Sequence, residues 1–198
     1  MQEIHEPQKG AITEVVGGRS SGKTRLLMSY IERATKGMEF AAVIDSTDSF
    51  DPVSAESAGI DLDRVLWIRC SEDLNTALKS ADYVLHGGGF GLVILDIGDV
   101  RPEIVARIPN SYWFRFRLAV EKTQTAFLLI SPLPCCGSSC SVSLQCTAEK
   151  IEWIGSPDHR LIKGFCFKSA MRKKPGMIPA GAEKSADRIS KKIILPRQ

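Results

Sequence analysis

The sequence contains no long hydrophobic run and no export signal. Its longest apolar runs, Leu92–Leu95 and Ala126–Ile130, are far shorter than the roughly 20 residues that a membrane-spanning helix needs. The N-terminus lacks a basic stretch followed by an apolar one, which is the pattern of a secretory signal. We therefore expect a cytoplasmic protein that has no membrane as a partner.

Paired cysteines of the zinc-knuckle type are also absent. Four of the six cysteines lie between Cys135 and Cys146, but their spacing, CC-x3-C-x5-C, matches none of the usual zinc patterns. Without an export signal the cysteines should remain reduced thiols. Cys146 also falls in an alternating strand pattern, where a buried thiol serves as a small apolar residue. The spacing favours cysteines without a metal.

The chain also lacks a strong charge of either sign. Its formal net charge is only +3 over 198 residues, which neither demands nor excludes nucleic acid as a partner. The segment from Arg160 onward is nevertheless rich in lysine and arginine and poor in acids. With 43% apolar and 25% charged residues, the composition is typical of a globular protein and not of a disordered or fibrous one.

Short apolar segments alternate with amphipathic ones, which predicts an α/β fold with a mostly parallel sheet and helices on both faces. Helices are expected over about 23–36, with Gly37 as a left-handed C-cap, over 52–58, from an N-cap at Ser71 to Gly87, and over 109–122. The expected strands are Ala11–Val16, Phe40–Asp45, Val65–Arg69, Leu92–Asp96 and Ala126–Ile130.

The pattern changes after Pro134. Residues 135–140 read as a loop of small residues, and alternation from Val142 and around Phe165 and Phe167 predicts an antiparallel extension of the sheet, with a turn at 157–159. The expected organisation is a short N-terminal segment (1–10), one α/β core (11–175) and a loose basic tail (176–198).

A phosphate-binding loop follows the first expected strand. The segment GGRSSGKT matches G-x4-G-K-[ST] in full, with a strand before it and a helix after it. Its amides and the positive end of the helix would hold the phosphates of ATP, Lys23 would reach the β- and γ-phosphates, and the Thr24 hydroxyl would bind Mg²⁺. The alternative is a glycine-rich turn with a surface lysine. The residues assigned to the nucleotide are Gly17, Gly18, Arg19, Ser20, Ser21, Gly22, Lys23, Thr24 and Arg25.

A second metal-binding group is expected at Asp96, which ends a near-continuous apolar strand. Parallel strands that are covered on both faces have this composition, and a carboxylate at such a strand end holds Mg²⁺ in phosphate-loop proteins. The alternative is an acidic turn residue. The expected magnesium site therefore consists of Thr24 and Asp96.

These blocks resemble the core of the RecA recombinase family. The resemblance rests on "ITEVVGGRSSGKT", "AAVIDSTDSFDPVSAESAGIDLDRVL", "LVILD" and "LIKGFCFKSAMRKKPG", which together cover most of residues 11–175. It implies a RecA-like fold, ATP and Mg²⁺ as ligands, and single-stranded DNA as a partner. It also implies that Asp51 contacts the edge of the nucleobase.

The chain departs from this family at the position of its catalytic glutamate. Thr47 stands there, and threonine cannot act as a general base at neutral pH. Asp48 is the adjacent carboxylate that could substitute. Ser54 replaces an aromatic residue that stacks on adenine, and Pro132 replaces the glutamine that senses the γ-phosphate. Hydrolysis is expected to be weak or absent.

A second resemblance is to the ImuA-type proteins, which are RecA-like accessory factors of error-prone translesion synthesis. It is carried by "AGIDLDRVLWIRC" and "RFRLAVEKTQTAFLLISPLP". We expect the segment that polymerises recombinase subunits to be missing before residue 11, and the second DNA-binding loop to be reduced to about 134–140. This resemblance implies a translesion polymerase subunit or RecA as a protein partner.

Two basic regions are candidates for DNA contact. Arg115 and Arg117 lie among aromatic residues, a mixture that suits single strands, but helical spacing favours a core helix with a solvated arginine edge. In the recombinase family, lysines near the end of the basic strand reach the ATP of the next subunit, and Arg172 and Lys174 are the nearest matches. DNA phosphate contact or plain solubility remain alternatives for them.

Three functional hypotheses follow. The first is an ATP-binding accessory factor in DNA repair and damage-induced mutagenesis, with weak or absent hydrolysis. The second is a DNA-dependent ATPase with recombinase activity, in which Lys23 and Asp48 are catalytic. The third is a scaffold or inhibitor that uses the fold only for protein contacts.

Overall fold

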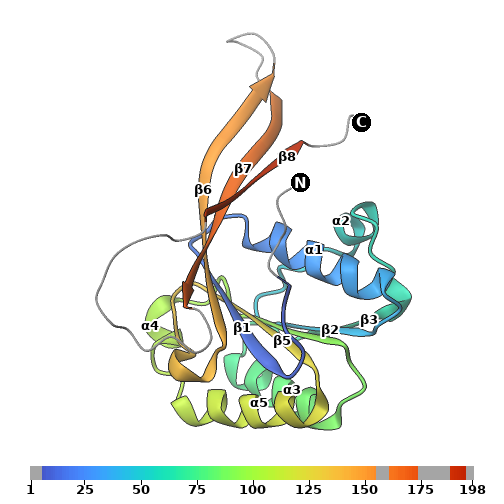
Figure 1. Ribbon diagram of the computed structural model, residues 1–198, viewed down its shortest axis with the longest axis vertical. Helices are drawn as coiled ribbons and strands as arrows, with labels where there is room; N and C mark the ends of the chain where they lie inside the picture. Colours follow the sequence, from blue (N-terminus) through green and yellow to red (C-terminus); the bar gives the residue numbers. More distant parts are fainter. Residues whose placement is uncertain (1–5, 155–160, 174–187, 195–198) are drawn as a thin grey trace.

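The computed structural model describes the backbone of residues 6–154, 161–173 and 188–194, and the side chains of residues 6–148. Strands and helices alternate through the first two thirds of the chain (Figure 1). The helices are α1 (Lys23–Lys36), α2 (Pro52–Ser57), α3 (Leu74–Gly87), α4 (Pro102–Val105) and α5 (Asn110–Thr123), with 3-10 turns at Leu62–Arg64 and Gly137–Ser139. The strands are β1 (Ala11–Val16), β2 (Ala41–Asp45), β3 (Val65–Arg69), β4 (Leu92–Asp96), β5 (Ala126–Ser131), β6 (Val142–Ile154), β7 (Leu161–Lys173) and β8 (Arg188–Ile194).

All eight strands form one sheet in the order β3-β2-β4-β5-β1-β6-β7-β8. The pairs from β3 to β6 are parallel, and β6–β7 and β7–β8 are antiparallel. The predicted α/β class, with a mostly parallel sheet and an antiparallel C-terminal extension, is therefore confirmed.

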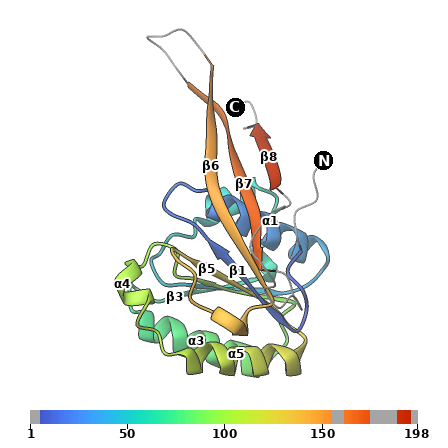
Figure 2. The ribbon, with the colours of Figure 1, turned by 60° about the vertical axis from the view of Figure 1, so that its left-hand side comes forward.

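Helices cover both faces of the parallel part (Figures 1 and 2). On one face, Trp113 and Phe116 of α5 pack with α3 against the sheet, and Phe116 meets Phe127 edge to face at 5.5 Å. On the other face, Leu27 and Ile31 of α1 are buried against the strands. Each central strand therefore buries both of its faces, which explains why β4 and β5 consist almost entirely of apolar residues.

The parallel register brings the carboxyl ends of the central strands to one edge of the sheet. Asp45 at the end of β2 pairs in register with Asp96 at the end of β4, and β1 ends nearby at Val16, where the glycine-rich loop begins. Open α/β sheets bind ligands at this edge. The topology therefore places three loops with chemically active side chains next to one another.

The C-terminal strands extend beyond this core. Strand β6 runs parallel to β1 along one edge over its first residues and pairs with β7 along its other edge, and β6 and β7 form a long hairpin that projects from the body (Figures 1 and 2). The turn expected at 157–159 lies outside the described residues. Residues 188–194 form β8 against β7, so the prediction of a loose tail was wrong for this stretch, because the edge of β7 offers a partner for the backbone.

Two predicted helix ends were also wrong. Gly37 follows α1 with φ −77°, and Met38 takes the left-handed conformation at φ 60°. The cap of α3 is Asp73, whose side chain accepts from the amide of Asn75 at 2.9 Å, whereas Ser71 lies in a turn with φ 49°. Either residue type can cap a helix, and the path of the chain after β3 decides between them.

In the part of the chain that the structure describes, no helix is both long enough and apolar enough to cross a bilayer.

Candidate nucleotide-binding site

The glycine-rich loop joins β1 to α1 with its helical amides uncapped. Gly22 occupies the N-cap position at φ 89°, with no side-chain cap, and the first turn of α1 carries no acidic residue. Gly17 is required by space, because a Cβ atom there would lie 2.4 Å from the Ser21 Oγ and 2.8 Å from the Cys146 carbonyl oxygen. The start of α1 can therefore bind an anion through backbone N–H groups and the helix dipole.

Lys23 points back across this loop. Its ammonium group donates to the carbonyl oxygens of Gly17 at 2.7 Å and Gly98 at 2.9 Å, and only 7% of the residue is exposed. Burial lowers the pKa of Lys23, while Asp99 and Asp96 act in the opposite direction. An ammonium group has three donors, so two hydrogen bonds hold the side chain in place and leave a third donor for a phosphate oxygen.

Asp96 lies beside the loop, on the same side of the sheet. Its Oδ1 accepts from the Gly98 amide at 2.8 Å, and the Ser49 hydroxyl donates to its Oδ2 at 3.3 Å. Burial raises the pKa of Asp96 to about 6, with Asp45 adding to the rise and Lys23 opposing it. A buried carboxylate of this kind is costly without a cation, so the position suits a divalent ion.

These groups surround one hollow of about 240 Å³ at the carboxyl edge of the sheet. Its chemistry fits a magnesium-bound phosphate chain, because amides and an ammonium group face carboxylate and hydroxyl oxygens, the ligand type that Mg²⁺ prefers. Thr24 and Asp96 would hold the ion. The lining residues are Arg19, Ser20, Ser21, Gly22, Lys23, Thr24, Ser49, Asp96, Gly98, Asp99 and Ile130.

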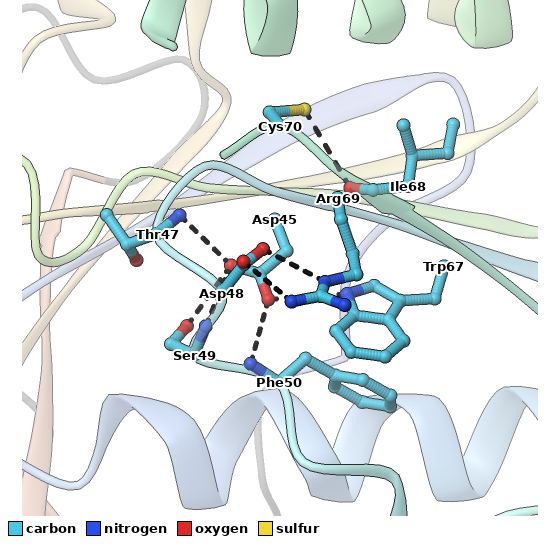
Figure 3. A network of polar contacts seen from close by, with 9 residues as sticks. All are labelled: Asp45, Thr47, Asp48, Ser49, Phe50, Trp67, Ile68, Arg69 and Cys70. Carbon is cyan, nitrogen blue, oxygen red and sulfur yellow. Dashed lines mark hydrogen bonds and ion pairs between the residues drawn. The ribbon is translucent and has the colours of Figure 1, made fainter. Parts of the chain in front are cut away.

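The loop after β2 is organised around Asp45, which is fully buried (Figure 3). Its carboxylate accepts from the amides of Thr47 at 3.2 Å, Ser49 at 3.1 Å and Phe50 at 2.8 Å, and from the Trp67 Nε1 at 3.3 Å. A buried carboxylate with this many donors is well satisfied. The backbone of the loop is therefore held in a defined conformation next to the phosphate hollow.

Neither Thr47, at the expected position of the catalytic glutamate, nor its possible substitute Asp48 lines the hollow. The Thr47 hydroxyl is buried without a hydrogen-bond partner among the described residues. Asp48 has φ 54° and pairs with Arg69, with Arg69 Nε to Oδ1 at 3.2 Å and Nη2 to Oδ2 at 2.8 Å (Figure 3). This hydrogen bond lowers the pKa of Asp48, and the guanidinium also lies 5.1 Å from the Trp67 ring. The geometry does not support Asp48 as a general base, because Arg69 occupies its carboxylate.

The other residues predicted to bind the nucleotide differ in whether they line the hollow. Asp51 caps α2, accepting from the amides of Val53 at 3.3 Å and Ser54 at 3.1 Å, and it does not line the hollow. Arg25 is exposed and does not line it either, whereas Arg19 reaches Asp99 at 3.7 Å. The structure thus gathers the loop residues and Asp96, and leaves Asp51 and Arg25 outside.

Four lining residues were missed by the sequence reasoning. Ser49 and Asp99 offer oxygens to the hollow, and Ile130 adds an apolar side chain. Gly98 must lack a side chain, since a Cβ atom there would lie 2.9 Å from the Asp96 Oδ1. The available signal was the short spacing Asp96-Ile97-Gly98-Asp99. Its meaning depends on the register of β4 beside β2.

The two basic candidates at the C-terminal strand lie at or beyond the limit of the described chain. Arg172 falls at an irregularity of the β6–β7 pairing, where Ser143 pairs with Lys173 and Leu144 with Met171. Lys174 lies outside the described residues. Their roles remain predictions.

A strand, a glycine-rich loop, a helix and a carboxylate at a neighbouring strand end are together the parts of the P-loop class of α/β proteins. The family described as the RecA N-terminal domain matches residues 4–107, more than half of the chain. The chain therefore belongs to the RecA family.

Sequence relatives named Protein RecA support this family assignment. The protein of Borrelia turicatae (strain 91E135) is 29% identical over 63% of this chain and 38% of its own length. That of Desulfotalea psychrophila (strain LSv54 / DSM 12343) is 24% identical over 94% of this chain and 54% of its own. A crystal structure of the RadB recombinase superposes with a TM-score of 0.61 at 14% identity, covering 92% of this chain and 87% of that one. The chain thus spans about two fifths to one half of these RecA relatives, and RadB supports the fold.

Proposed function

We propose that this chain is an ATP-binding, RecA-like accessory factor in DNA repair and damage-induced translesion synthesis, with weak or absent ATP hydrolysis. The observation that carries the proposal is a contrast within one site. The uncapped helix start, Lys23 and Asp96 line one hollow whose chemistry suits phosphate and magnesium, whereas the loop after β2 brings no free carboxylate into it.

Binding follows from groups that are already in place. Backbone amides at Gly22, Lys23 and Thr24 would bind the phosphates, and Lys23 would add a charge-assisted hydrogen bond, which is worth about 1.5–3 kcal/mol. Asp96 and the Thr24 hydroxyl would hold Mg²⁺, which would supply charge neutralisation for the phosphate oxygens.

Hydrolysis needs a further group that removes a proton from the attacking water. Thr47 has no such chemistry, and Arg69 holds the Asp48 carboxylate. Nucleotide would consequently act as a structural ligand or as a switch that resets slowly. The ImuA-type resemblance supports the accessory role, with single-stranded DNA and a translesion polymerase subunit or RecA as partners.

The deciding experiment measures ATP binding by calorimetry and ATP turnover with and without single-stranded DNA. Binding with little turnover is the expected result, and Lys23→Ala should weaken the binding about 30-fold. ATP turnover that is stimulated by DNA would overturn the accessory hypothesis and favour a DNA-dependent ATPase with recombinase activity. The names of the RecA and RadB relatives favour this second hypothesis. No binding at all would leave a scaffold or inhibitor.

A further inference from the structure

A second cluster of chemically active groups lies around the middle of β1, outside the nucleotide hollow. Glu14, in the middle of β1, is only 1% exposed. One carboxylate oxygen accepts from the amides of Cys135 at 2.7 Å and Cys136 at 3.0 Å, and the other from the Ser143 hydroxyl at 2.9 Å. The 135–140 loop, distant in sequence, is therefore anchored on this single acid.

The anchoring brings two thiols to the same carboxylate. A carboxylate oxygen of Glu14 and the Sγ atoms of Cys135 and Cys136 all lie within 4.8 Å of one another. Cys136 is 3% exposed and Cys135 is half-buried. Two thiolates bound to one zinc ion lie roughly 3.8 Å apart, given Zn–S bonds of about 2.3 Å. Small side-chain movements would therefore bring all three groups into bonding distance of one ion.

Glu14 has no cationic partner within the described part of the chain. Buried charges in proteins are normally paired or coordinate metals. An ionised carboxylate accepts about four hydrogen bonds or metal bonds, and neutral donors supply three to Glu14. One position thus remains open on the acid, beside two sulfur ligands.

We propose that Glu14, Cys135 and Cys136 form a binding site for a thiophilic divalent cation of the zinc type. Thiolate ligands select zinc over magnesium or calcium, and the partly exposed Cys135 provides the route of entry. Each ion bound displaces two thiol protons into solvent and completes its coordination with water or with the Ser131 hydroxyl, which lies 3.6 Å from the Cys135 Sγ.

Cobalt titration of the full-length reduced protein tests this site directly. One equivalent of Co²⁺ per chain should produce a sulfur-to-cobalt charge-transfer band, which Zn²⁺ then removes. Co²⁺ bound only by oxygens at Asp96 gives no such band, so the two sites are distinguishable. A wild-type chain with no band overturns the proposal.

Variants separate a ligand from a merely structural acid. Cys135→Ser and Cys136→Ser should each weaken cobalt binding by at least tenfold, whereas Cys70→Ser, a buried thiol elsewhere, should not change it. Glu14→Gln retains an oxygen that accepts from the loop amides but removes the charge, so it should keep the fold and lose affinity. Equal affinity in Cys136→Ser or loss in Cys70→Ser overturns the proposal.

A measurement on the wild-type chain avoids any folding defect of these variants. Zn²⁺ should protect the half-buried Cys135 from iodoacetamide, as located by peptide mass spectrometry, without changing the labelling of Cys70. Equal labelling with and without Zn²⁺ contradicts the site. Lys23→Ala should retain the cobalt band, so failure here leaves the nucleotide proposal standing.

Discussion

The loops that follow β1 and β2 lie at the same edge of the sheet, but they differ in what they retain. The loop after β1 keeps both the backbone and the side chains of a phosphate cradle, including Lys23. The loop after β2 keeps its buried organiser, Asp45, but carries Thr47 where a catalytic acid is expected. The comparison teaches that the architecture of a loop and the chemistry of its side chains can vary separately, because backbone hydrogen bonds and chemically active groups depend on different residues.

The largest expected effect comes from breaking the architecture of the loop after β2. Asp45→Asn replaces an acceptor of several buried donors with an amide whose N–H groups face them. We expect the free energy of unfolding in urea to fall by about 3 kcal/mol, as for a broken buried polar network. A variant as stable as the wild type would mean that the carboxylate does not organise the loop.

The next effect concerns the loop after β1. Lys23→Ala removes one charged donor from the cradle, so ATP affinity should fall by about 30-fold, equivalent to about 2 kcal/mol. Calorimetry with Mg-ATP measures this change. Lys36→Ala, an exposed lysine at the end of the same helix that pairs with Glu32, is the matched control and should leave affinity unchanged. Equal losses in both variants would remove the special role of Lys23.

Restoring the missing chemistry sharpens the comparison further. Thr47→Glu introduces a general base at the position where the family has its catalytic glutamate, so turnover of ATP should rise about tenfold. This gain is smaller than the roughly 10²–10⁴-fold of an evolved general base, because no neighbouring groups position the new glutamate. Thr47→Gln has the same size without the base. If both variants turn over ATP at the same rate, the loop backbone no longer presents this position to the phosphates.

The smallest effect is expected at the neighbouring acid. Asp48 is exposed and pairs with Arg69, and exposed ion pairs contribute little. Asp48→Asn should therefore leave both the urea midpoint and any residual ATP turnover unchanged within error. A clear loss of turnover would falsify the assignment of Asp48 to Arg69 and make it the base that replaces the glutamate.

Much of the fold could be predicted because its signals are local. The apolar strands of the parallel sheet were predicted within a residue or so of their ends, and α1 and α2 follow from periodicity and from Pro52 at a helix start. Strand β8 could not be predicted in the same way, since a short basic segment without alternating polarity becomes a strand only when the edge of β7 is available. The N-cap of α3 was predicted wrongly for a similar reason, because the position of β3 determines the turn through Ser71.

In the candidate site, too, the residues with a local sequence signal could be predicted and those placed by strand pairing could not. The phosphate loop was recognisable as a motif, and Asp96 as the end of an apolar strand. Ser49 and Gly98 were missed, because they reach the hollow only through the pairing of β2 with β4. The cysteine spacing favoured no metal, and no spacing rule could include Glu14, which comes from another strand.

The sequence by itself determined the phosphate loop, the alternation of strands and helices, and the presence of Thr47 in the loop after the second strand. These depend on residue identity and on contacts between near neighbours in the chain. Only the tertiary structure decided that Arg69 holds Asp48, and that Glu14 meets a loop 121 residues away along the chain. Such contacts follow from strand order and register, which bring distant segments together and which no local pattern encodes.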